Sequence, residues 1–189
     1  MENIAIFASG NGTNCANIIK YFSKSTEINI RLVITNNPKA KVIERAEALG
    51  TTVITMTKDE ISDSQKLLPV LEKYEIEYIV LAGFLLFIPD FLVRAYSRHI
   101  INIHPSLLPK YGGKGMYGIH VHEAVKANGE KESGITIHYI NNEYDKGEII
   151  AQYSTEITEQ DTAEDIATKV HAIEYKYFPP TIERIIREK

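Results

Sequence analysis

Two polar residues, Asn102 and His104, stand two positions apart in the apolar segment Ile100–His104. Such a segment predicts a buried strand, in which residues two apart project from the same face. An imidazole titrates near neutral pH and can move a proton, and an amide N–H can donate to an oxygen that becomes negative. Because these groups together suit attack on a carbonyl carbon, we predict that Asn102 and His104 are catalytic.

A carboxylate beside the imidazole would complete this chemistry, because it orients the ring and favours its charged form. Our candidate is Asp145, in the turn-forming segment Asn141–Gly147. Asparagine, histidine and aspartate also cap loops and turns without any role in catalysis. Each of the three residues therefore has a structural interpretation as well, and the catalytic one requires the fold to bring them together.

The glycine-containing segment Ser9–Asn14 lies between an apolar strand-like segment and a segment with helical spacing. Backbone N–H groups at such a junction bind anions, which predicts a phosphate site. Cys15 stands where a dinucleotide fingerprint has its third glycine, and no Gly-Lys-Ser/Thr follows, so neither NAD nor a nucleoside triphosphate is favoured. The alternative is a tight turn that needs glycine only for its backbone. We interpret Cys15 as a packing residue rather than a nucleophile.

Apolar and helical segments alternate along the chain and must position these residues. Strands are predicted at residues 3–8, 28–35, 52–55, 78–82, 100–104, 134–140 and 148–154, and helices at 15–22, 62–74, 89–96 and 119–127. This alternation predicts an α/β fold with a Rossmann-like open sheet, mostly parallel, with helices on both faces. Because residues 134–140 alternate between polar and apolar, we also expect one antiparallel edge strand.

Three further segments have local signals. Asn37 can cap a helix that has Pro38 at its first position and Gly50 just past its end. Asp161 and Glu164 have capping-box spacing for a C-terminal helix to about residue 177, which consecutive prolines at 179 and 180 should interrupt. The loop 105–118 holds two prolines and four glycines, and long loops are often functional, so we assign it to the site.

Composition limits the classes of function. The 189 residues predict one domain, 1–189, and 21 Lys and Arg against 25 Asp and Glu give a formal charge of −4, which disfavours nucleic-acid binding. The single cysteine and the absence of a leader-like or 20-residue apolar segment lead us to expect a cytoplasmic protein without a membrane span. The six histidines lack metal-ligand spacing, so we expect no metal. A monomer and a homodimer are both compatible with one domain.

Four motifs occur together in a known order and spacing: Ala8–Asn14 (ASGNGTN), Leu81–Phe84 (LAGF), Asn102–Pro109 (NIHPSLLP) and Asp145–Gly147 (DKG). Through them the chain resembles the folate-dependent formyltransferase family over nearly its full length. The first motif resembles the branch of that family that acts on glycinamide ribonucleotide. The loop Tyr111–Gly118 is longer than the segment common in the family.

The resemblance implies transfer of a formyl group from 10-formyltetrahydrofolate, a co-substrate, to the amine of 5-phosphoribosylglycinamide in purine biosynthesis, with no metal. It implies that Gly12, Thr13 and Asn14 bind the phosphate and that Glu174 contacts the ribonucleotide. The residues that it assigns to the folate pocket are Leu85, Leu86, Phe87, Ile88, Asn102 and Asn141. Leu86 and Phe87 stand where some relatives have an arginine.

Two alternatives stay open at this point. The first keeps a formyltransferase and changes the acceptor to an amino-sugar nucleotide or to water. The second is a non-catalytic module that binds phosphate or folate. Such a module would bind ligand without formyl transfer and would have no need of Asn102, His104 and Asp145 together.

Overall fold

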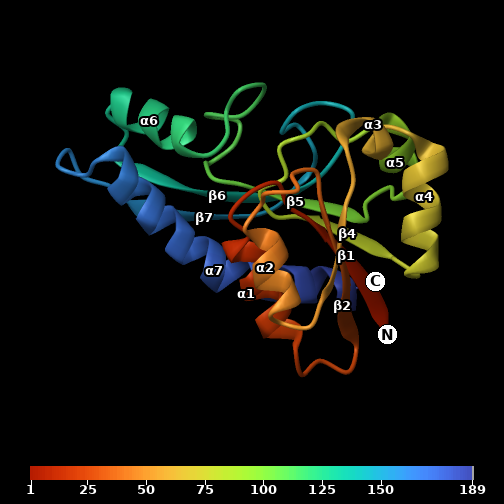
Figure 1. Ribbon diagram of the computed structural model, residues 1–189. Coiled ribbons are helices and arrows are strands. Elements are labelled where there is room, and N and C mark those ends of the chain that lie inside the picture. The colour runs from red at the N-terminus through yellow and green to blue at the C-terminus, as the bar shows by residue number, and fades with distance from the viewer. Residues whose placement is uncertain (189) are drawn as a thin grey trace. The chain divides into compact units, whose positions relative to one another are not determined.

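The computed structural model describes residues 1–188, which form two compact units (Figure 1). Unit 1 comprises Met1–Ile101 with the C-terminal residues from Ile186, and unit 2 comprises Asn102–Ile185. The strands are hydrogen-bonded in the order β3-β2-β1-β4-β5-β6-β7. They are β1 (Glu2–Phe7), β2 (Ile28–Thr35), β3 (Thr52–Thr55), β4 (Tyr78–Leu81), β5 (Ile100–His104), β6 (Glu132–Tyr139) and β7 (Ile149–Glu156). The prediction that residues 1–189 form a single domain stays a prediction.

Strand pairing confirms a mostly parallel sheet with one antiparallel edge strand, but that edge strand is β7, and the predicted strand 134–140 corresponds to the buried inner strand β6. β1 pairs in parallel with β2 and with β4, β2 pairs in parallel with β3, and β7 is an antiparallel partner of β6. The segment Ile4–Phe7 of β1 is fully buried. Burial on both faces of a central parallel strand explains why this segment is continuously apolar rather than alternating.

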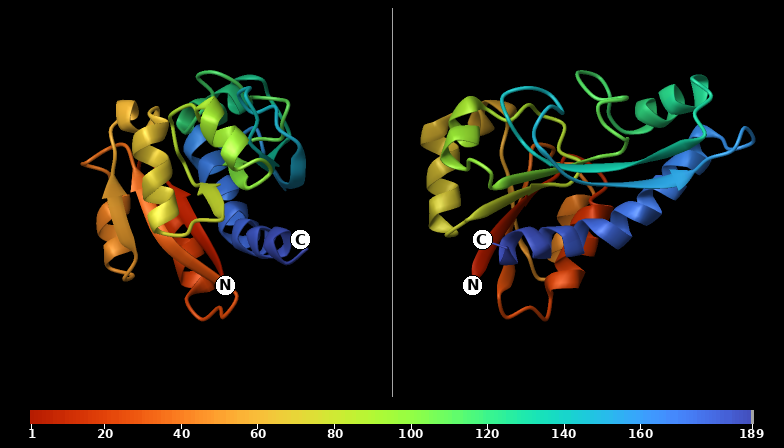
Figure 2. Two further views of the ribbon diagram at one scale, coloured as in Figure 1. Left: turned by 90° about the vertical axis from the view of Figure 1, so that its right-hand side faces the viewer. Right: turned by 180° about the vertical axis from the view of Figure 1, so that it is seen from behind.

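The helices of unit 1 lie on both faces of its strands (Figures 1 and 2). One face carries α1 (Thr13–Phe22) and α2 (Val42–Glu47), and the other carries α3 (Lys58–Ile61), α4 (Ser64–Lys73) and α5 (Asp90–Ala95). The strand order runs outward from β1 to β3 and then reverses to β4 and β5, so right-handed crossovers place the helices before the reversal on one face and those after it on the other. At such a reversal the carboxyl ends of β1 and β4 are open to a ligand.

The predicted helix between Asn37 and Gly50 is wrong at its start. Asn37 does not cap a helix: its Oδ1 accepts from the backbone N–H of Lys39 at 3.0 Å, and its carbonyl accepts from the N–H of Ala40. These bonds close a turn, because a short amide side chain competes locally with helical hydrogen bonding. Helix α2 begins only at Val42.

The helix α3 is not among the predicted elements. It is a single turn of four residues that begins at a capping box, in which Thr57 and Glu60 each bond the other's backbone N–H. The box satisfies two N–H groups that the first turn leaves without helical partners. Asp63 then caps α4 by accepting from the N–H of Gln65, which shortens the predicted helix 62–74 at its start.

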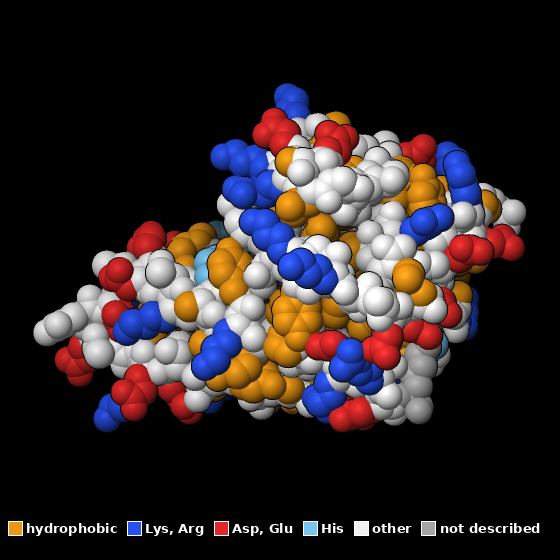
Figure 3. Space-filling view, turned by 90° about the horizontal axis from the view of Figure 1, so that it is seen from below, with side chains coloured by type: hydrophobic (Ala, Val, Ile, Leu, Met, Phe, Trp, Pro, Cys, Tyr) orange, Lys and Arg blue, Asp and Glu red, His pale blue; other side chains and the backbone are white. Residues whose placement is uncertain are grey.

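Charged side chains of both signs are interspersed on the face of the molecule shown in Figure 3. On this face the two signs alternate rather than gathering into separate regions. Within residues 1–188, no helix is both long enough and apolar enough to cross a membrane.

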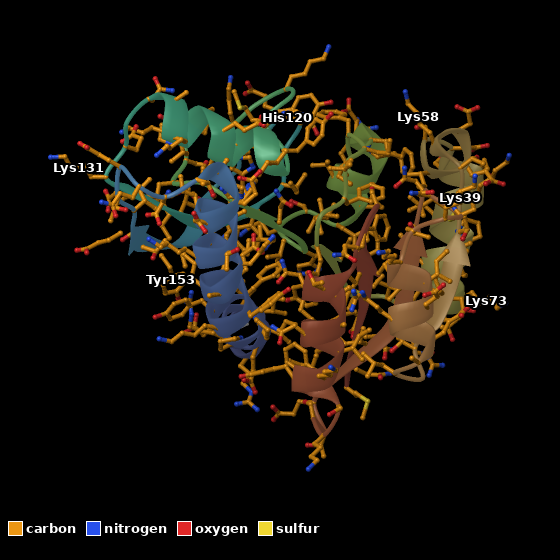
Figure 4. All side chains as sticks on the ribbon, turned by 60° about the vertical axis from the view of Figure 1, so that its left-hand side comes forward. Lys39, Lys58, Lys73, His120, Lys131 and Tyr153 are labelled. Carbon is orange, nitrogen blue, oxygen red and sulfur yellow. The ribbon has the colours of Figure 1, made fainter. Side chains whose placement is uncertain are left out.

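Unit 2 is built on the pair β6 and β7 with α6 (Ile119–Ala127) and most of α7 (Ala163–Arg187). Tyr153 of β7 lies beside α7 (Figure 4), where its ring stacks on Tyr177 with centroids 3.9 Å apart. The backbone of β6 at Gly134 lies close to β7, since a Cβ at this position would lie 2.2 Å from the Tyr153 carbonyl oxygen. Glycine at this position therefore allows the two strands to approach.

Helix α7 corrects two predictions about the C-terminal segment. It continues through Pro179 and Pro180 to Arg187 rather than being interrupted. Proline inside a helix costs about 3 kcal/mol, but one face of this helix is buried along its length. The buried apolar side chains that α7 contributes within unit 2 include Ile166, Val170, Phe178 and Ile182.

The capping residues of α7 also differ from those predicted. Thr162 and Asp165 form the reciprocal cap, with the Asp165 N–H donating to Thr162 Oγ1 at 3.1 Å and the Thr162 N–H donating to Asp165 Oδ2 at 2.9 Å. Asp161 instead accepts from the Thr158 N–H and pairs with Lys169 at 2.6 Å. The box is therefore one residue later than Asp161 and Glu164.

Candidate active site

The end of β5 places Asn102 and His104 in unit 2. His104 is 4% exposed, and Asn102 is half-buried. Their alternation with buried isoleucines puts both side chains on one face of the strand, as the two-residue period predicts.

His104 is held between two oxygen atoms. Its Nε2 donates to the backbone carbonyl of Tyr111 at 2.7 Å, and its Nδ1 lies 3.6 Å from Asp145 Oδ2. A carbonyl oxygen only accepts, so Nε2 carries a proton, and a second proton on Nδ1 would face a carboxylate. The ring of His104 is therefore oriented with Nε2 toward the Tyr111 carbonyl and Nδ1 toward the Asp145 carboxylate.

Asp145 is fixed in the turn before β7. Its Oδ2 accepts from the backbone N–H of Gly113 at 2.9 Å, and its backbone is left-handed with a φ of 52°. Aspartate is one of the few residues that tolerate this conformation. The fold thus brings together the three residues Asn102, His104 and Asp145, which the sequence alone left separate.

His138 is a fourth polar residue of this group, and sequence reasoning missed it. It is fully buried in β6, its Nε2 lies 3.0 Å from Asn102 Nδ2, and it lies 3.8 Å from Asp145 Oδ1. Burial lowers the pKa of His138 below its ordinary value of 6.5, although the Tyr139 carbonyl and Asp145 oppose that shift. The signal in the sequence was a histidine inside an otherwise apolar strand.

Buried hydrogen bonds anchor the first part of the loop 105–118 to unit 2. Thr136 Oγ1 donates to the Ser106 carbonyl at 2.7 Å and accepts from the Leu108 N–H at 2.9 Å. Gln152 Nε2 donates to the Leu108 carbonyl, also at 2.9 Å. The start of the loop therefore has a defined path, which sets the position of the Tyr111 carbonyl against His104.

Glu174 of α7 is buried at 4% exposure, and His171 Nδ1 lies 2.7 Å from its Oε2. This hydrogen bond raises the pKa of His171. His122 of α6 belongs to the same electrostatic group, because His171, Glu174 and His104 all act on its charge. Burial, with a smaller contribution from the neighbouring histidines, lowers the pKa of His122 to about 4. Unit 2 therefore keeps His122 neutral near the predicted catalytic histidine.

The glycine turn after β1 lies in unit 1. Gly12 has a φ of 72° at the start of α1, and a Cβ there would lie 2.5 Å from the Val42 side chain. Gly12 is the N-cap residue of α1, and it provides no side-chain hydrogen bond to the first turn. Thr13 and Asn14 lie in the first turn of α1, and the dipole of a helix favours an anion at this end.

Ser9 joins this turn to the segment that follows β4. Its N–H donates to the Gly83 carbonyl at 3.0 Å, and its Oγ accepts from the Leu85 N–H at 2.9 Å. Its Oγ also donates to Asn36 Oδ1 at 2.6 Å, which ties in the segment after β2. Three loops at the carboxyl edge of unit 1 therefore share one hydroxyl group.

The predicted folate residues fall into different environments. Leu85 is 56% exposed and Phe87 is 41% exposed, whereas Ile88 is buried, and all three belong to unit 1. Leu86 is half-buried between them. Asn141 belongs to unit 2, where it donates to the Lys146 carbonyl and accepts from the Glu143 N–H, so it closes the turn that carries Asp145.

Cys15 is buried, and burial raises the pKa of its thiol to about 12. A thiol held so strongly in its neutral form is a poor nucleophile, in line with its predicted packing role. Within the described part of the chain, no group of three or more His, Cys, Asp or Glu side chains is placed to hold a metal ion.

The open sheet, with its mostly parallel strands and helices on both faces, is that of a Rossmann-like α/β protein. Residues 2–182 match the family described as formyl transferase, and the chain belongs to this family. The match confirms the resemblance that the four sequence motifs indicate.

Several relatives carry the same name. The chain is 39% identical to the chloroplastic phosphoribosylglycinamide formyltransferase of Arabidopsis thaliana, over 100% of this chain and 66% of that protein. It is 38% identical to the phosphoribosylglycinamide formyltransferase of Bacillus subtilis, over 98% of this chain and 95% of that one. The chain thus spans less of the plant protein than of the bacterial one.

Solved structures that are similar to this chain bear the same name as these relatives. The phosphoribosylglycinamide formyltransferase of Anaplasma phagocytophilum matches with a TM-score of 0.90 and 31% identity, over 100% of this chain and 88% of that one. The enzyme of that name from Bacillus halodurans matches with a TM-score of 0.87 and 34% identity, over 98% and 95% of the two chains. The fold is therefore that of structures bearing this name.

Proposed function

We propose that this protein transfers a formyl group from 10-formyltetrahydrofolate to the amine of 5-phosphoribosylglycinamide, a step of purine biosynthesis. Membership of the formyl transferase family supports the reaction type. The names of the relatives support the acceptor. The observation that carries the proposal is the grouping of Asn102, His104 and Asp145 at the end of β5.

Formyl transfer begins when the uncharged amine of the ribonucleotide attacks the formyl carbon. A C–N bond forms, and the carbonyl electron pair moves onto oxygen to give a tetrahedral oxyanion. An N–H of the Asn102 amide and a protonated His104 stabilise that charge. Asp145, 3.6 Å from His104 Nδ1, favours the charged ring.

The intermediate then breaks its bond to the folate nitrogen. The attacking nitrogen loses one proton and the leaving folate nitrogen gains one, so the transfer is neutral overall. We assign the proton movement to the neighbourhood of Asp145, by way of a water molecule. In this scheme His104 exchanges no proton with either substrate.

The remaining predicted residues bind the two substrates. We assign the ribonucleotide phosphate to the first-turn N–H groups at Gly12, Thr13 and Asn14, which the helix dipole of α1 supports. We assign Glu174 to the ribonucleotide and the exposed apolar side chains of Leu85 and Phe87 to the pterin ring, because flat heteroaromatic rings bind apolar surfaces.

The experiment mixes the purified protein with both substrates and follows release of the deformylated folate by absorbance. A parallel reaction omits the ribonucleotide. Release that requires the ribonucleotide supports the proposed donor and acceptor together. Release without it would instead indicate hydrolysis of the folate.

Two other results would lead to the alternatives. Release only with an amino-sugar nucleotide would keep the formyl chemistry and change the acceptor. Binding of folate or phosphate with no release under any condition would indicate a non-catalytic module. The cytoplasmic location and the choice between monomer and homodimer are further proposals, which fractionation and light scattering address.

A further inference from the structure

The hydrogen bonds around His138 define which of its nitrogen atoms carries the proton. Nδ1 lies 2.9 Å from the Tyr139 carbonyl oxygen, which can only accept, so Nδ1 carries a proton. In the neutral ring Nε2 then holds a lone pair and needs a donor. Asn102 Nδ2, at 3.0 Å, is that donor.

The opposite arrangement requires a charged ring. If the Asn102 amide presented its Oδ1 to His138, Nε2 would also need a proton, and the ring would be an imidazolium. His138 is fully buried, which penalises that charge. The nearest carboxylate oxygen, Asp145 Oδ1, lies 3.8 Å from Nε2, which is too far for a hydrogen bond. The buried His138 ring is therefore neutral, and Asn102 donates an N–H to its Nε2.

This arrangement decides how the Asn102 amide meets a substrate. An amide nitrogen has two N–H donors, and His138 accepts one of them. Asn102 is half-buried, so part of its amide stays accessible. A flipped amide would exchange the positions of its donor and its acceptor and would no longer present its second N–H in the same direction.

We propose that His138 is a positioning residue, which as the neutral Nδ1–H tautomer holds the Asn102 amide so that an N–H, rather than the carbonyl oxygen, is available to the reacting carbonyl. The proposal rests on the proposed function of Asn102 in formyl transfer. His138 itself contacts no reacting atom. Its effect passes entirely through Asn102.

The close packing of the turn before β7 supports a fixed ring. A Cβ at Gly147 would lie 1.6 Å from the Tyr139 carbonyl oxygen and 3.4 Å from His138 Nδ1. Glycine thus allows this turn to approach the carbonyl that orients His138. The titratable groups that act on the ring are Asp145, which favours its charge, and His104, which opposes it.

A double-mutant cycle tests whether His138 acts through Asn102. The variants are His138→Leu, Asn102→Ala and their combination, with turnover and ribonucleotide KM measured for each. We expect His138→Leu alone to lower kcat by about tenfold or more with little change in KM, and to lower it by less than about threefold once Asn102 is alanine. His138→Gln, whose amide oxygen can accept the same N–H, should recover part of the loss.

A matched control separates positioning from general damage to β6. Ile135 is fully buried on the same strand three residues before His138, so Ile135→Ala should combine additively with Asn102→Ala. Equal losses from His138→Leu in both backgrounds would overturn the proposal while leaving formyl transfer intact. A wild-type protein without formyl transfer would instead overturn the proposed function.

Nitrogen NMR of the wild-type protein tests the tautomer directly and does not require an active variant. The imidazole signals of His138 are assigned by their loss in His138→Gln. We expect one protonated nitrogen, Nδ1, and one lone-pair nitrogen, Nε2, at neutral pH. A proton on Nε2, in either the other tautomer or the charged ring, would overturn the proposal.

Discussion

Replacement of His122 by glutamine should remove a defined part of the acid sensitivity of this protein. His122 of α6 is 2% exposed, and its pKa falls from the ordinary 6.5 to about 4. Burial is the main cause, because the buried ring loses the water that would stabilise its charge. The positive charges of His171 and His104 lower the pKa further, and Glu174 offsets part of that effect.

The sign of the effect follows from proton binding. Between the two pKa values the unfolded chain binds a proton at His122 and the folded protein does not, so acid favours the unfolded chain. The stability that neutral His122 preserves is present above 6.5 and is lost as the pH falls toward 4. These values correspond to a loss of about 2 kcal/mol in the free energy of unfolding between about pH 7.5 and pH 5.

The assay is urea unfolding of the wild type and His122→Gln at several pH values across this range. The difference between the two proteins isolates His122 from the other titrating groups, so the variant should lose about 2 kcal/mol less than the wild type. His120→Gln is the matched control, because His120 lies on the same helix with 58% of its side chain exposed. Figure 4 shows His120 at the beginning of α6.

Parallel stability curves for the wild type and His122→Gln would contradict the lowered pKa of His122. That result would mean that His122 is protonated equally easily in the folded and unfolded states. A constant difference between the two curves would reflect a packing defect in the variant, because the cost of such a defect does not change with pH.

Three further predictions concern catalysis and folding. His104→Ala and Asp145→Ala should each lower turnover by about 100-fold or more and change the ribonucleotide Kd by less than about threefold; intact turnover in either would contradict the assignment. Gly147→Ala should lower the free energy of unfolding in urea by about 1–3 kcal/mol, because its Cβ would meet a backbone oxygen at 1.6 Å, whereas Gly10→Ala, with open space around it, should not. Thr162→Ala should lower that same free energy by about 1 kcal/mol through loss of the α7 cap, and an unchanged value would argue against the cap.

The proximity of Asn102, His104 and Asp145 could be predicted from the sequence to the extent that local rules apply. The two-residue period of a strand places Asn102 and His104 on one face, and the chemistry of an imidazole calls for a carboxylate. Asp145 fulfils that expectation at 3.6 Å from the ring. His138 could not be found in this way, because a histidine within an apolar strand resembles a core residue until the neighbouring strand is known.

The errors in the fold come from competition between local and tertiary effects. Asn37 has the local signal of a cap but closes a turn instead. Pro179 and Pro180 have the local signal of a helix end, yet α7 continues because Phe178 and Ile182 beside them are buried. The Asn37 turn is a competing local hydrogen-bond pattern, whereas the continuation of α7 depends on burial, which is set by parts of the chain that are distant in sequence.

The Tyr111 carbonyl, 2.7 Å from His104 Nε2, occupies the hydrogen-bonding position that an oxyanion would need on this ring. A buried N–H without an acceptor costs about 1–3 kcal/mol, so this carbonyl stabilises the resting enzyme. A ligand that binds the same N–H must displace it, and gains only the difference between two hydrogen bonds. Tight mimics of the tetrahedral intermediate should therefore show slow-onset inhibition, with an association rate limited by the departure of the carbonyl rather than by diffusion.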